Sequence, residues 1–421
     1  MEWRRNRVFA ENSVSSPHHR KRNCMHNNFN KLWLGQTISQ VGTYLGALSL
    51  LAILYLDATP TQMGMLETLR ALPALLIGLV AGVWVDRWRR RPILIYTDIG
   101  RAVLLLLVIL LAFANVLHIN HLYLIGLLSG TLTVFFNLAY RSYLPSLVSS
   151  QQLVRANARL SSTESIAEIA SPGLGGLLVQ WIGAPLTLLA DATSFLFSAA
   201  IISRIPNTEP IPSGPANKQA ISIEILEGIQ TLLHHRQLRA LAGASATRSF
   251  FGGFFAALYS LYVLRDIGLS PTLLGILIGA GGIGALVATL LIEPLSQRIR
   301  PKTLFMGSLF GSGLLGLCVP LAQGSQYPML LLFGSQLLGD FCLAIYFILE
   351  MSLRQSSTPI HLLGRVNASF EFVTQGIGTA GIFIGGFVGA TLGMRLALTL
   401  AVCGMIGAVG WIVGVEFEET G

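Results

Sequence analysis

Charged residues are scarce in this chain. Asp, Glu, Lys and Arg together make up 11% of its 421 residues, whereas a soluble protein carries about a quarter. This shortage argues against a soluble globular fold. The formal net charge of +8 does not indicate a nucleic-acid partner, because the positive residues are placed in short segments between long apolar runs.

The sequence also lacks the residue patterns of common catalytic and metal sites. Its four cysteines form no CxxC pair, and three of them lie in apolar stretches, so we expect inert, buried thiols. There is no Walker loop, H-E-x-x-H, G-x-S-x-G or Cys/His metal set. We therefore expect no enzymatic activity, no cofactor, no metal and no direct use of ATP. The cysteines are Cys24, Cys318, Cys342 and Cys403.

Long apolar runs, such as Ile93–Phe113 and Leu122–Leu138, dominate the sequence. A run of about 18 or more residues with few charges crosses a hydrocarbon core of about 30 Å as a helix, and a helix satisfies its own backbone there. The alternation typical of a transmembrane β-barrel is absent. The sequence predicts an all-α membrane protein with twelve transmembrane helices in two pseudo-symmetric six-helix bundles. Their approximate limits are 32–55, 66–85, 93–114, 121–143, 160–181, 184–203, 240–263, 272–293, 303–322, 327–349, 367–390 and 394–415.

Basic residues are distributed unevenly over the segments between these spans. Alternate segments are rich in arginine, as in Arg87–Arg91 and Arg298–Lys302, and the intervening ones hold only Arg265 and Arg395. Positive loops stay in the cytosol, so both termini are predicted to be cytosolic and the membrane to be the inner (plasma) membrane. An even number of spans agrees with this orientation.

The polar segments suggest a domain division. The first thirty residues are basic and contain no apolar run, so they are not a cleavable signal peptide; Met25 is an alternative start. A break with four prolines and an amphipathic run, Ile221–Leu233, separates six spans from six. The predicted parts are a disordered cytosolic tail (1–30), a first bundle (31–204), a cytosolic linker with a surface helix (205–235), a second bundle (236–415) and a cytosolic C-terminus (416–421).

The two halves resemble copies of one unit. Arg155–Ala158 (RANA) recurs as Arg365–Ala368 (RVNA), a shift of 210 residues, and at the same shift Gly175-Gly176 falls on Gly385-Gly386. Two parallel six-helix repeats, with a binding site between them near the middle of the membrane, are typical of one transporter architecture.

The segment GVWVDRWRRRP, residues 82–92, resembles the signature loop of the major facilitator superfamily, G-x-x-x-D-R-x-x-R-R. The matching residues are Gly82, Asp86, Arg87, Arg90 and Arg91. The resemblance implies a gate in which Asp86 bridges arginines and a helix N-terminus of the other half. The simpler interpretation is a basic loop that only sets the topology, although Asp86 serves no topological purpose.

A second segment, Ala170–Gly176 (ASPGLGG), is similar to the G-P-x-x-G-G element of drug:proton antiporters in that superfamily, with Ser171 where a glycine is usual. The matching residues are Pro172, Gly173, Gly175 and Gly176. Ordinary glycine-mediated helix packing is the alternative. Beyond these motifs, much of the chain from Asn30 onward resembles the multidrug, macrolide and enterobactin efflux branch, which implies proton-driven export.

Ionisable residues within spans are costly in lipid and usually face a cavity or a partner. Glu164 and Glu168 share one helix face. Two adjacent carboxylates favour a proton on one of them, so both are candidates for proton coupling, together with Asp191 and Glu371. Asp98 and Arg101 are spaced to pair with each other. Polar positions predicted to line a cavity are Gln36, Gln40, Asn137, Arg141 and Gln375.

The sequence therefore predicts a secondary transporter, most simply a monomer, that exports a small amphipathic compound such as a drug or siderophore by alternating access, coupled to protons. An importer or lipid flippase of the same fold is the first alternative. A membrane sensor or scaffold that transports nothing is an alternative of another class.

Overall fold

The computed structural model describes residues 17–148, 152–206, 229–360 and 362–415, and every regular element in these ranges is a helix. The first half contains α1 (Pro17–Tyr44), α2 (Ala47–Leu54), α3 (Pro60–Arg87), α4 (Arg90–Phe113), α5 (Ile119–Leu147), α6 (Leu153–Ile182) and α7 (Ala184–Ser203). The second half contains α9 (Arg236–Arg265), α10 (Pro271–Arg298), α11 (Pro301–Gly316), α12 (Cys318–Ala322), α13 (Pro328–Ser356), α14 (Leu363–Leu392), α15 (Met394–Gly407) and the short 3₁₀ helix η2 (Ala408–Trp411).

Nine segments of the described residues are long and apolar enough to cross a membrane, counting α1 with α2, α11 with α12, and α15 with η2 as single segments. The helices α3, α6 and α9 have 28, 30 and 30 residues and fall outside that set. Each carries several charged side chains, so they are long enough to span but less apolar. With them, the described helices are consistent with the twelve predicted spans.

The N-terminal boundary differs from the prediction. Helix α1 begins at Pro17, earlier than the predicted start of the first bundle at residue 31, while the division into tail, bundles and linker stays a prediction. No glycine or proline interrupts the chain between Pro17 and the first span, and a helix already nucleated by that span extends at little cost. Residues 1–16, most of the predicted linker helix and residues 416–421 lie outside the described residues.

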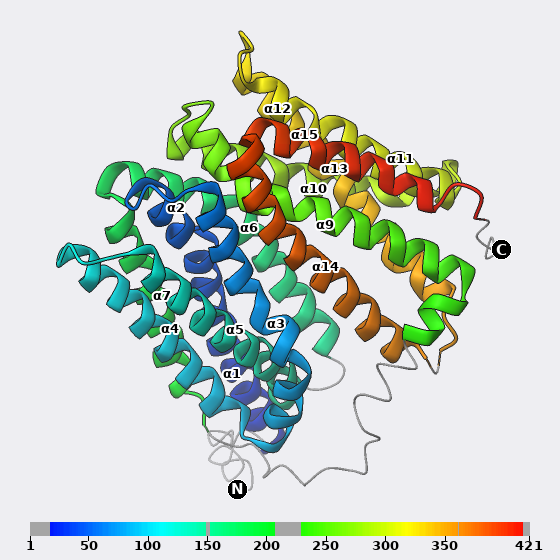
Figure 1. Ribbon diagram of the computed structural model, residues 1–421. Helices are drawn as coiled ribbons and strands as arrows, with labels where there is room; N and C mark the ends of the chain where they lie inside the picture. The colour runs from blue at the N-terminus through cyan, green and yellow to red at the C-terminus, as the bar shows by residue number, and fades with distance from the viewer. Residues whose placement is uncertain (1–16, 149–151, 207–228, 361, 416–421) are drawn as a thin grey trace, which may run out of the picture.

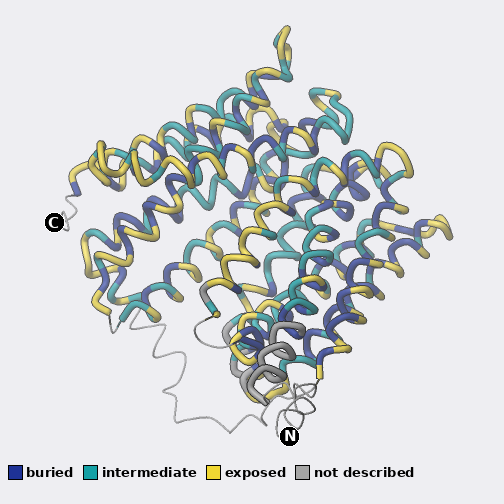
Figure 2. Tube along the Cα trace, turned by 180° about the vertical axis from the view of Figure 1, so that it is seen from behind, coloured by how far each residue is buried: buried dark blue, intermediate teal, exposed yellow. Residues whose placement is uncertain are grey.

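Helices of each half pack mainly against one another. In the first half α3 packs on α5 and α4 on α7; in the second, α9 packs on α14 and α10 on α13. Figure 1 shows the two groups as bundles, the first coloured blue to green and the second green to red. Figure 2 shows the buried residues on the inner sides of the helices and exposed ones on the outer sides. Between the halves, α6 contacts α10 and α3 contacts α14.

The repeat seen in the sequence has matching helix boundaries. Helices α6 and α14 each have 30 residues and begin 210 positions apart. Each ends at a glycine with positive φ, 83° at Gly183 and 86° at Gly393, and the next helix starts one residue later. Only glycine adopts this conformation freely, so the sharp turn between the last two helices of each half depends on it.

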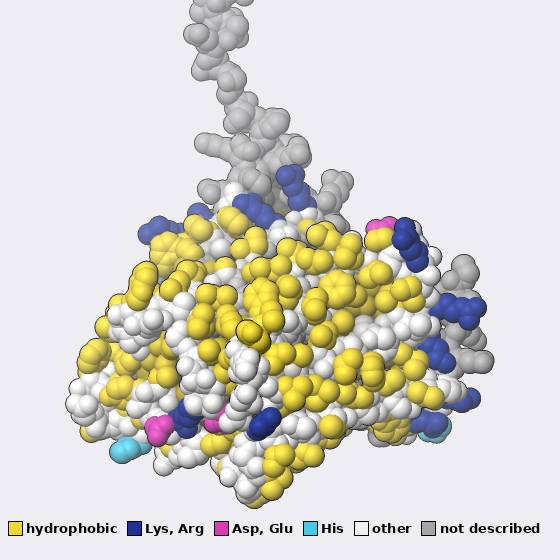
Figure 3. Space-filling model, turned by 90° about the horizontal axis from the view of Figure 1, so that it is seen from above, with side chains coloured by type: hydrophobic (Ala, Val, Ile, Leu, Met, Phe, Trp, Pro, Cys, Tyr) yellow, Lys and Arg dark blue, Asp and Glu magenta, His cyan; other side chains and the backbone are white. Residues whose placement is uncertain are grey.

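The outer surface is apolar. Leu110, Leu290 and Leu330 are 65%, 70% and 70% exposed, and the view from above in Figure 3 is largely hydrophobic, with charged side chains near its edges. This surface explains a wrong detail of the cysteine prediction: Cys403 is exposed, and Cys318 and Cys342 are only partly buried. In a membrane an apolar stretch need not be buried in protein, because its side chains can face lipid.

Candidate transport cavity

The two halves touch closely at one end of the molecule. This closed end carries the loops 55–59, 114–118, 266–270 and 323–327; the opposite, basic end carries the arginine-rich segments 87–91 and 298–302. Gly64 of α3 faces Gly386 of α14, and a Cβ atom built on Gly64 would lie 2.8 Å from the Gly386 Cα. The helices can approach this closely only because both positions lack a side chain.

The exporter-like motif forms the matching contact on the other side. Gly176 of α6 faces the backbone of Pro271 and Thr272 in α10, and a Cβ on it would lie 2.9 Å from the Thr272 Cα. A Cβ on Gly275 would lie 2.8 Å from the Gly173 Cα, and Gly175 packs on the backbone of Leu45. Helix α6 continues through Pro172. The motif is therefore the place where α6 of the first half meets α10 of the second.

Polar contacts add to this closure. Arg265, the last residue of α9, forms an ion pair with Asp57 in the loop before α3 and donates a hydrogen bond of 3.2 Å to the Ile53 carbonyl. The Thr272 hydroxyl donates to the Gln180 amide oxygen at 2.5 Å. All three contacts join the first half to the second. From this end the bundles diverge toward the basic end (Figures 1 and 2).

Two cavities lie between the halves. The larger, of about 710 Å³, is lined mainly by α9, α13 and α14, and we call it the C-terminal cavity. The smaller, of about 380 Å³, is lined mainly by α3, α4, α5 and α7, and we call it the N-terminal cavity. Both include Ala71, Ala74, Ala256 and Ile382 in their lining, so they adjoin where the halves meet. Each volume falls in the range that holds a small molecule.

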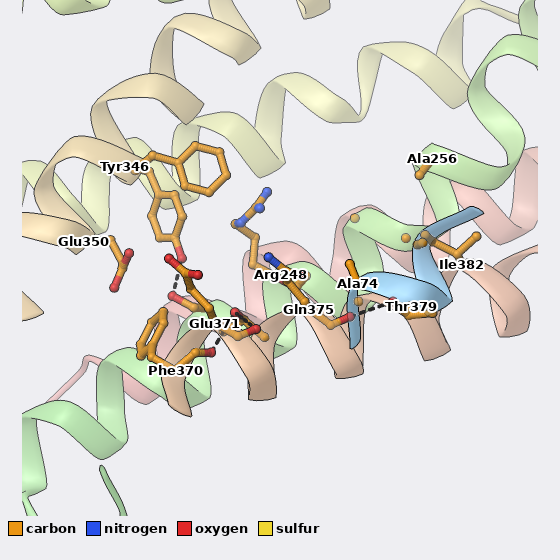
Figure 4. A pocket seen from close by; sticks show the side chains of 18 of the residues that line it. Ala74, Arg248, Ala256, Tyr346, Glu350, Phe370, Glu371, Gln375, Thr379 and Ile382 are labelled. Carbon is orange, nitrogen blue, oxygen red and sulfur yellow. Dashed lines mark hydrogen bonds between the residues drawn. The ribbon is translucent and has the colours of Figure 1, made fainter. Parts of the chain in front are cut away.

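Charged groups of the C-terminal cavity are stacked on aromatic rings. The Arg248 guanidinium carbon lies 4.6 Å from the Phe347 ring centroid and 5.3 Å from that of Tyr346. Arg354 lies 4.2 Å from the Phe370 centroid, and its Nε is 3.5 Å from the Glu350 carboxylate. Figure 4 shows Arg248, Tyr346, Glu350 and Glu371 around one space, supplied by α9, α13 and α14.

The N-terminal cavity is lined by ion-paired groups. Glu67 accepts hydrogen bonds from Arg70 at 3.0 Å and from the Ser49 hydroxyl at 2.6 Å. Arg101 pairs with the buried Asp98, as predicted. Its guanidinium lies between two rings, 4.4 Å from the Phe136 centroid and 4.2 Å from that of Phe195. Asp191 lines the same cavity, and its buried Oδ1 has no hydrogen-bond partner among the described residues.

Four of the predicted site residues line these cavities: Asp191 and Asn137 the smaller, Glu371 and Gln375 the larger. Gln40 is half-buried, Gln36 is buried and Arg141 is exposed; none of the three lines either cavity. For these three residues, a place in the lining of the transport cavity stays a prediction. A period of four along a helix identifies one face, but the tilt of the helix decides what that face meets.

The carboxylates of α6 lie outside both linings. Glu164 and Glu168 are exposed and both act electrostatically on the Tyr44 hydroxyl of α1. Glu168 also acts on Asp340 of α13, in the other half. The Gly279–Gly282 segment of α10 lies between Glu168 and Asp340, because it touches Ile169 on one side and Asp340 on the other. Glu168 is thus placed on the α6–α10 side of the interface rather than in the cavities.

The signature-loop residues lie at the basic end. Arg91 donates a hydrogen bond of 3.3 Å from Nε to the Ile202 carbonyl and another to the Ser203 carbonyl, which ties α4 to the end of α7. Arg87 is exposed, and Arg90 and Gly82 are half-buried. The Asp86 side chain lies outside the described part of the structure, so its predicted bridge remains a prediction.

Sequence reasoning missed two features. Glu67 and Arg70 lie within a predicted span and line the N-terminal cavity, and their i, i+3 spacing in an apolar stretch was the available signal. Arg354 lies after the predicted limit of the span 327–349, but it is buried and paired with Glu350. Its position four residues after Glu350 was the signal there.

Comparisons with known proteins agree with this architecture. Residues 23–419 match the model of the transmembrane secretion effector family, which is part of the major facilitator superfamily. The chain belongs to this family. It is 26% identical over 407 residues to the uncharacterized MFS-type transporter YfiS of Bacillus subtilis (strain 168), covering 92% of this chain and 93% of that one.

The chain is also similar to an exporter whose substrate is known by name. It is 26% identical over 408 residues to the enterobactin exporter EntS of Citrobacter koseri, covering 92% of this chain and 90% of the exporter. Among solved structures, a bacterial homologue of the iron transporter ferroportin in an inward-facing state matches with a TM-score of 0.73 at 17% identity, over 92% of this chain and 98% of that one. The protein is therefore a multi-pass membrane transporter of the major facilitator fold and not an enzyme.

Proposed function

We propose that this protein exports a small amphipathic compound, such as a drug or siderophore, by alternating access and in exchange for protons. The observation that carries the proposal is the pair of adjoining cavities between the halves, which contain ionisable groups and are closed at one end by glycine-mediated contacts. A site between two rocking halves is what alternating access requires. The family description and the similarity to an enterobactin exporter support export over import.

The direction of opening follows from the charge pattern. The basic end faces the cytosol under the positive-inside rule, so the described conformation would receive substrate from the cytosol. A reporter enzyme fused after Gly421 should register as cytosolic, and one inserted near Ser270 as external. A cytosolic signal at Ser270 would overturn this orientation.

Coupling to protons needs a carboxylate that exchanges a proton as the halves move. Asp191 and Glu371 line the cavities. Glu164 and Glu168 lie on α6, and Glu168 directly precedes Ile169, which contacts α10. A proton entering from outside would neutralise one of these groups and release the substrate outward. Carboxylates in a membrane are costly when charged, which favours such an exchange.

Transport into everted vesicles is the direct test. Wild-type vesicles should accumulate the substrate when energised, and a proton uncoupler should abolish accumulation. Uptake into right-side-out vesicles would instead favour the importer, and movement of lipid alone the flippase. A protein that moves nothing in any orientation would leave the sensor or scaffold interpretation. A susceptibility panel of drugs and siderophores on a deletion strain would supply the substrate.

We also propose that Asp86 closes the basic end in the alternate state, by approaching the start of α14 near Arg365–Asn367. Asp86→Asn should impair transport by about tenfold or more, the usual scale for a lost charge-assisted bond, with normal expression. Arg89→Gln is the matched control, because Arg89 lies in the same loop outside the motif. An Asp86 side chain far from α14 in an outward-open structure would refute the proposal.

A further inference from the structure

Arg248 of α9 differs from the other arginines of the two cavities. Arg354 pairs with Glu350, Arg101 with Asp98 and Arg70 with Glu67. Among the residues that the structure describes, no carboxylate oxygen lies within 4.0 Å of the Arg248 guanidinium, and its buried Nε has no hydrogen-bond partner. A positive group near the middle of a membrane helix is costly without a partner, so this donor is available to a ligand.

The surroundings of Arg248 hold its guanidinium in place. It lies over the Phe347 and Tyr346 rings, and a hydrogen bond of 2.5 Å between the Tyr346 and Ser245 hydroxyls fixes one of those rings. Arginine combines a flat face for stacking with a fork of donors that fits an oxyanion. The rings occupy the face of the guanidinium, and part of its donor edge also acts on the Tyr346 hydroxyl. The buried Nε has no partner among the described residues, and the side chain borders the cavity.

The rest of the lining is suited to a flat apolar group. Phe347, Met351, Phe370 and Ile382 all border the C-terminal cavity. Aromatic rings bury a large area and stack favourably on one another and on a guanidinium. A ligand that places an oxyanion at Arg248 can therefore lay an aromatic ring against these side chains.

Two carboxylates of the same cavity, Glu350 and Glu371, affect which ligand charge the cavity favours. Glu350 is paired with Arg354. Glu371 is exposed, and no ion pair of its own is found among the described residues. The Glu350 Oε1 accepts no hydrogen bond among the described residues, but its charge is offset by Arg354, and the charge of Glu371 is solvated. Among the same residues Arg248 has neither a carboxylate partner nor a bond at its buried Nε, so the buried charge left without a partner is positive and favours an anion. Glu371 then weakens anion binding through repulsion without preventing it.

We propose that Arg248 anchors the anionic group of the substrate, and that the substrates are organic anions carrying an aromatic ring. The proposal rests on the proposed function only in taking the cavity as the substrate site. It names both a specificity-determining residue and the chemical class that this residue selects.

Binding to the purified full-length protein in lipid nanodiscs tests this with three probes that share one ring system. They are 1-naphthoate, the neutral 1-naphthalenemethanol and the cationic 1-naphthylmethylammonium. The wild type should bind the naphthoate at least about tenfold more tightly than the alcohol, since a hydrogen bond to a charged group is worth about 1.5–3 kcal/mol. The cation should bind most weakly.

Four variants assign the preference to a residue. Arg248→Gln should lose about tenfold or more in naphthoate affinity and keep its affinity for the alcohol, which also shows that it is folded. Arg248→Lys should retain part of the preference, and Glu371→Gln should bind naphthoate more tightly than the wild type. Arg239→Gln is the control, because Arg239 lies on the same helix but is exposed and bonded to the Leu233 carbonyl.

Three outcomes would overturn the proposal: equal affinity of the wild type for all three probes, preference for the cation, or no naphthoate binding at millimolar concentration. An unchanged naphthoate affinity in Arg248→Gln would also overturn it. None of these measurements uses a gradient or an oriented vesicle. Anion-selective binding without vesicle transport would thus refute the proposed export function alone, whereas proton-driven export with binding indifferent to charge would refute the anion site alone.

Discussion

Asp57 and Arg265 form an ion pair that joins the two halves at the closed end. Asp57 lies in the loop before α3, and its side chain is 92% exposed; Arg265 ends α9 and also bonds to the Ile53 carbonyl. The pair exists only while this end is closed. Because an exposed pair contributes at most about 1 kcal/mol, it adjusts the balance between conformations and does not enforce one.

Asp57→Asn should therefore increase the population that is open at this end, by no more than about fivefold. Spin labels at Val116 and Gln326, in exposed closed-end loops of opposite halves, would report the change as a longer distance by pulsed electron resonance. The swapped variant Asp57→Arg/Arg265→Asp should return the distribution toward that of the wild type. A swap that behaves like the single change would show that the charges do not act as a pair.

Gly64→Ala should destabilise the closed end much more strongly. The new methyl group would lie 2.8 Å from the Gly386 Cα and 3.0 Å from the Ile382 carbonyl oxygen, too close for either backbone. Overpacking costs about 1–3 kcal/mol, which shifts the equilibrium toward the state open at this end by about tenfold or more. The distance between spin labels at Val116 and Gln326 measures this shift.

Gly78→Ala is the matched control for this change. Gly78 lies on the same helix, and nothing lies within 4 Å of the Cβ that it would gain. Its spin-label distance should equal that of the wild type. Similar shifts in both variants would mean that loss of glycine from α3, rather than the contact with α14, causes the effect.

Asp98→Asn should lower stability substantially. Asp98 is completely buried and pairs with Arg101, which is held between Phe136 and Phe195. Removing one partner of a buried pair leaves an uncompensated charge and costs about 3–5 kcal/mol. Thermal unfolding of the detergent-solubilised protein should show a clearly lower midpoint. The double variant Asp98→Leu/Arg101→Leu should lose much less, and an equal loss would argue that packing rather than charge is responsible.

Glu168→Gln separates proton coupling from conformational cycling. A glutamine resembles a permanently protonated carboxyl group, so substrate exchange without a gradient should persist while proton-driven export stops. Asp191→Asn and Glu371→Gln test the alternative carriers in the same way. Glu293→Gln is a control on the neighbouring helix α10, where the residue is exposed. Full proton-driven export by Glu168→Gln would transfer the role to Asp191 or Glu371.

The local features were available from the sequence because they depend on neighbours along the chain. Apolar run length predicted the spanning helices, and the 210-residue repeat matches helices of equal length that end at equivalent glycines. The spacing of Asp98 and Arg101 was enough to predict their pair, since positions three apart share a helix face. Where an apolar stretch had to stand for burial in protein, as at Cys403, the prediction was wrong.

The site itself depended on how the helices are tilted and paired. Sequence spacing identified polar faces, but only packing decided that Asn137 and Gln375 line cavities and that Gln36 does not. The sequence shows that Arg354 has a carboxylate, Glu350, one helix turn away and that Arg248 has none. Only packing decided that Arg248 borders a cavity and that no carboxylate of another described helix reaches it. The sequence thus determined the class of protein, its spans and its repeat, through interactions within single helices. Only the tertiary structure decided which end is closed and which charge is left for a ligand, because both arise from contacts between helices far apart in the chain.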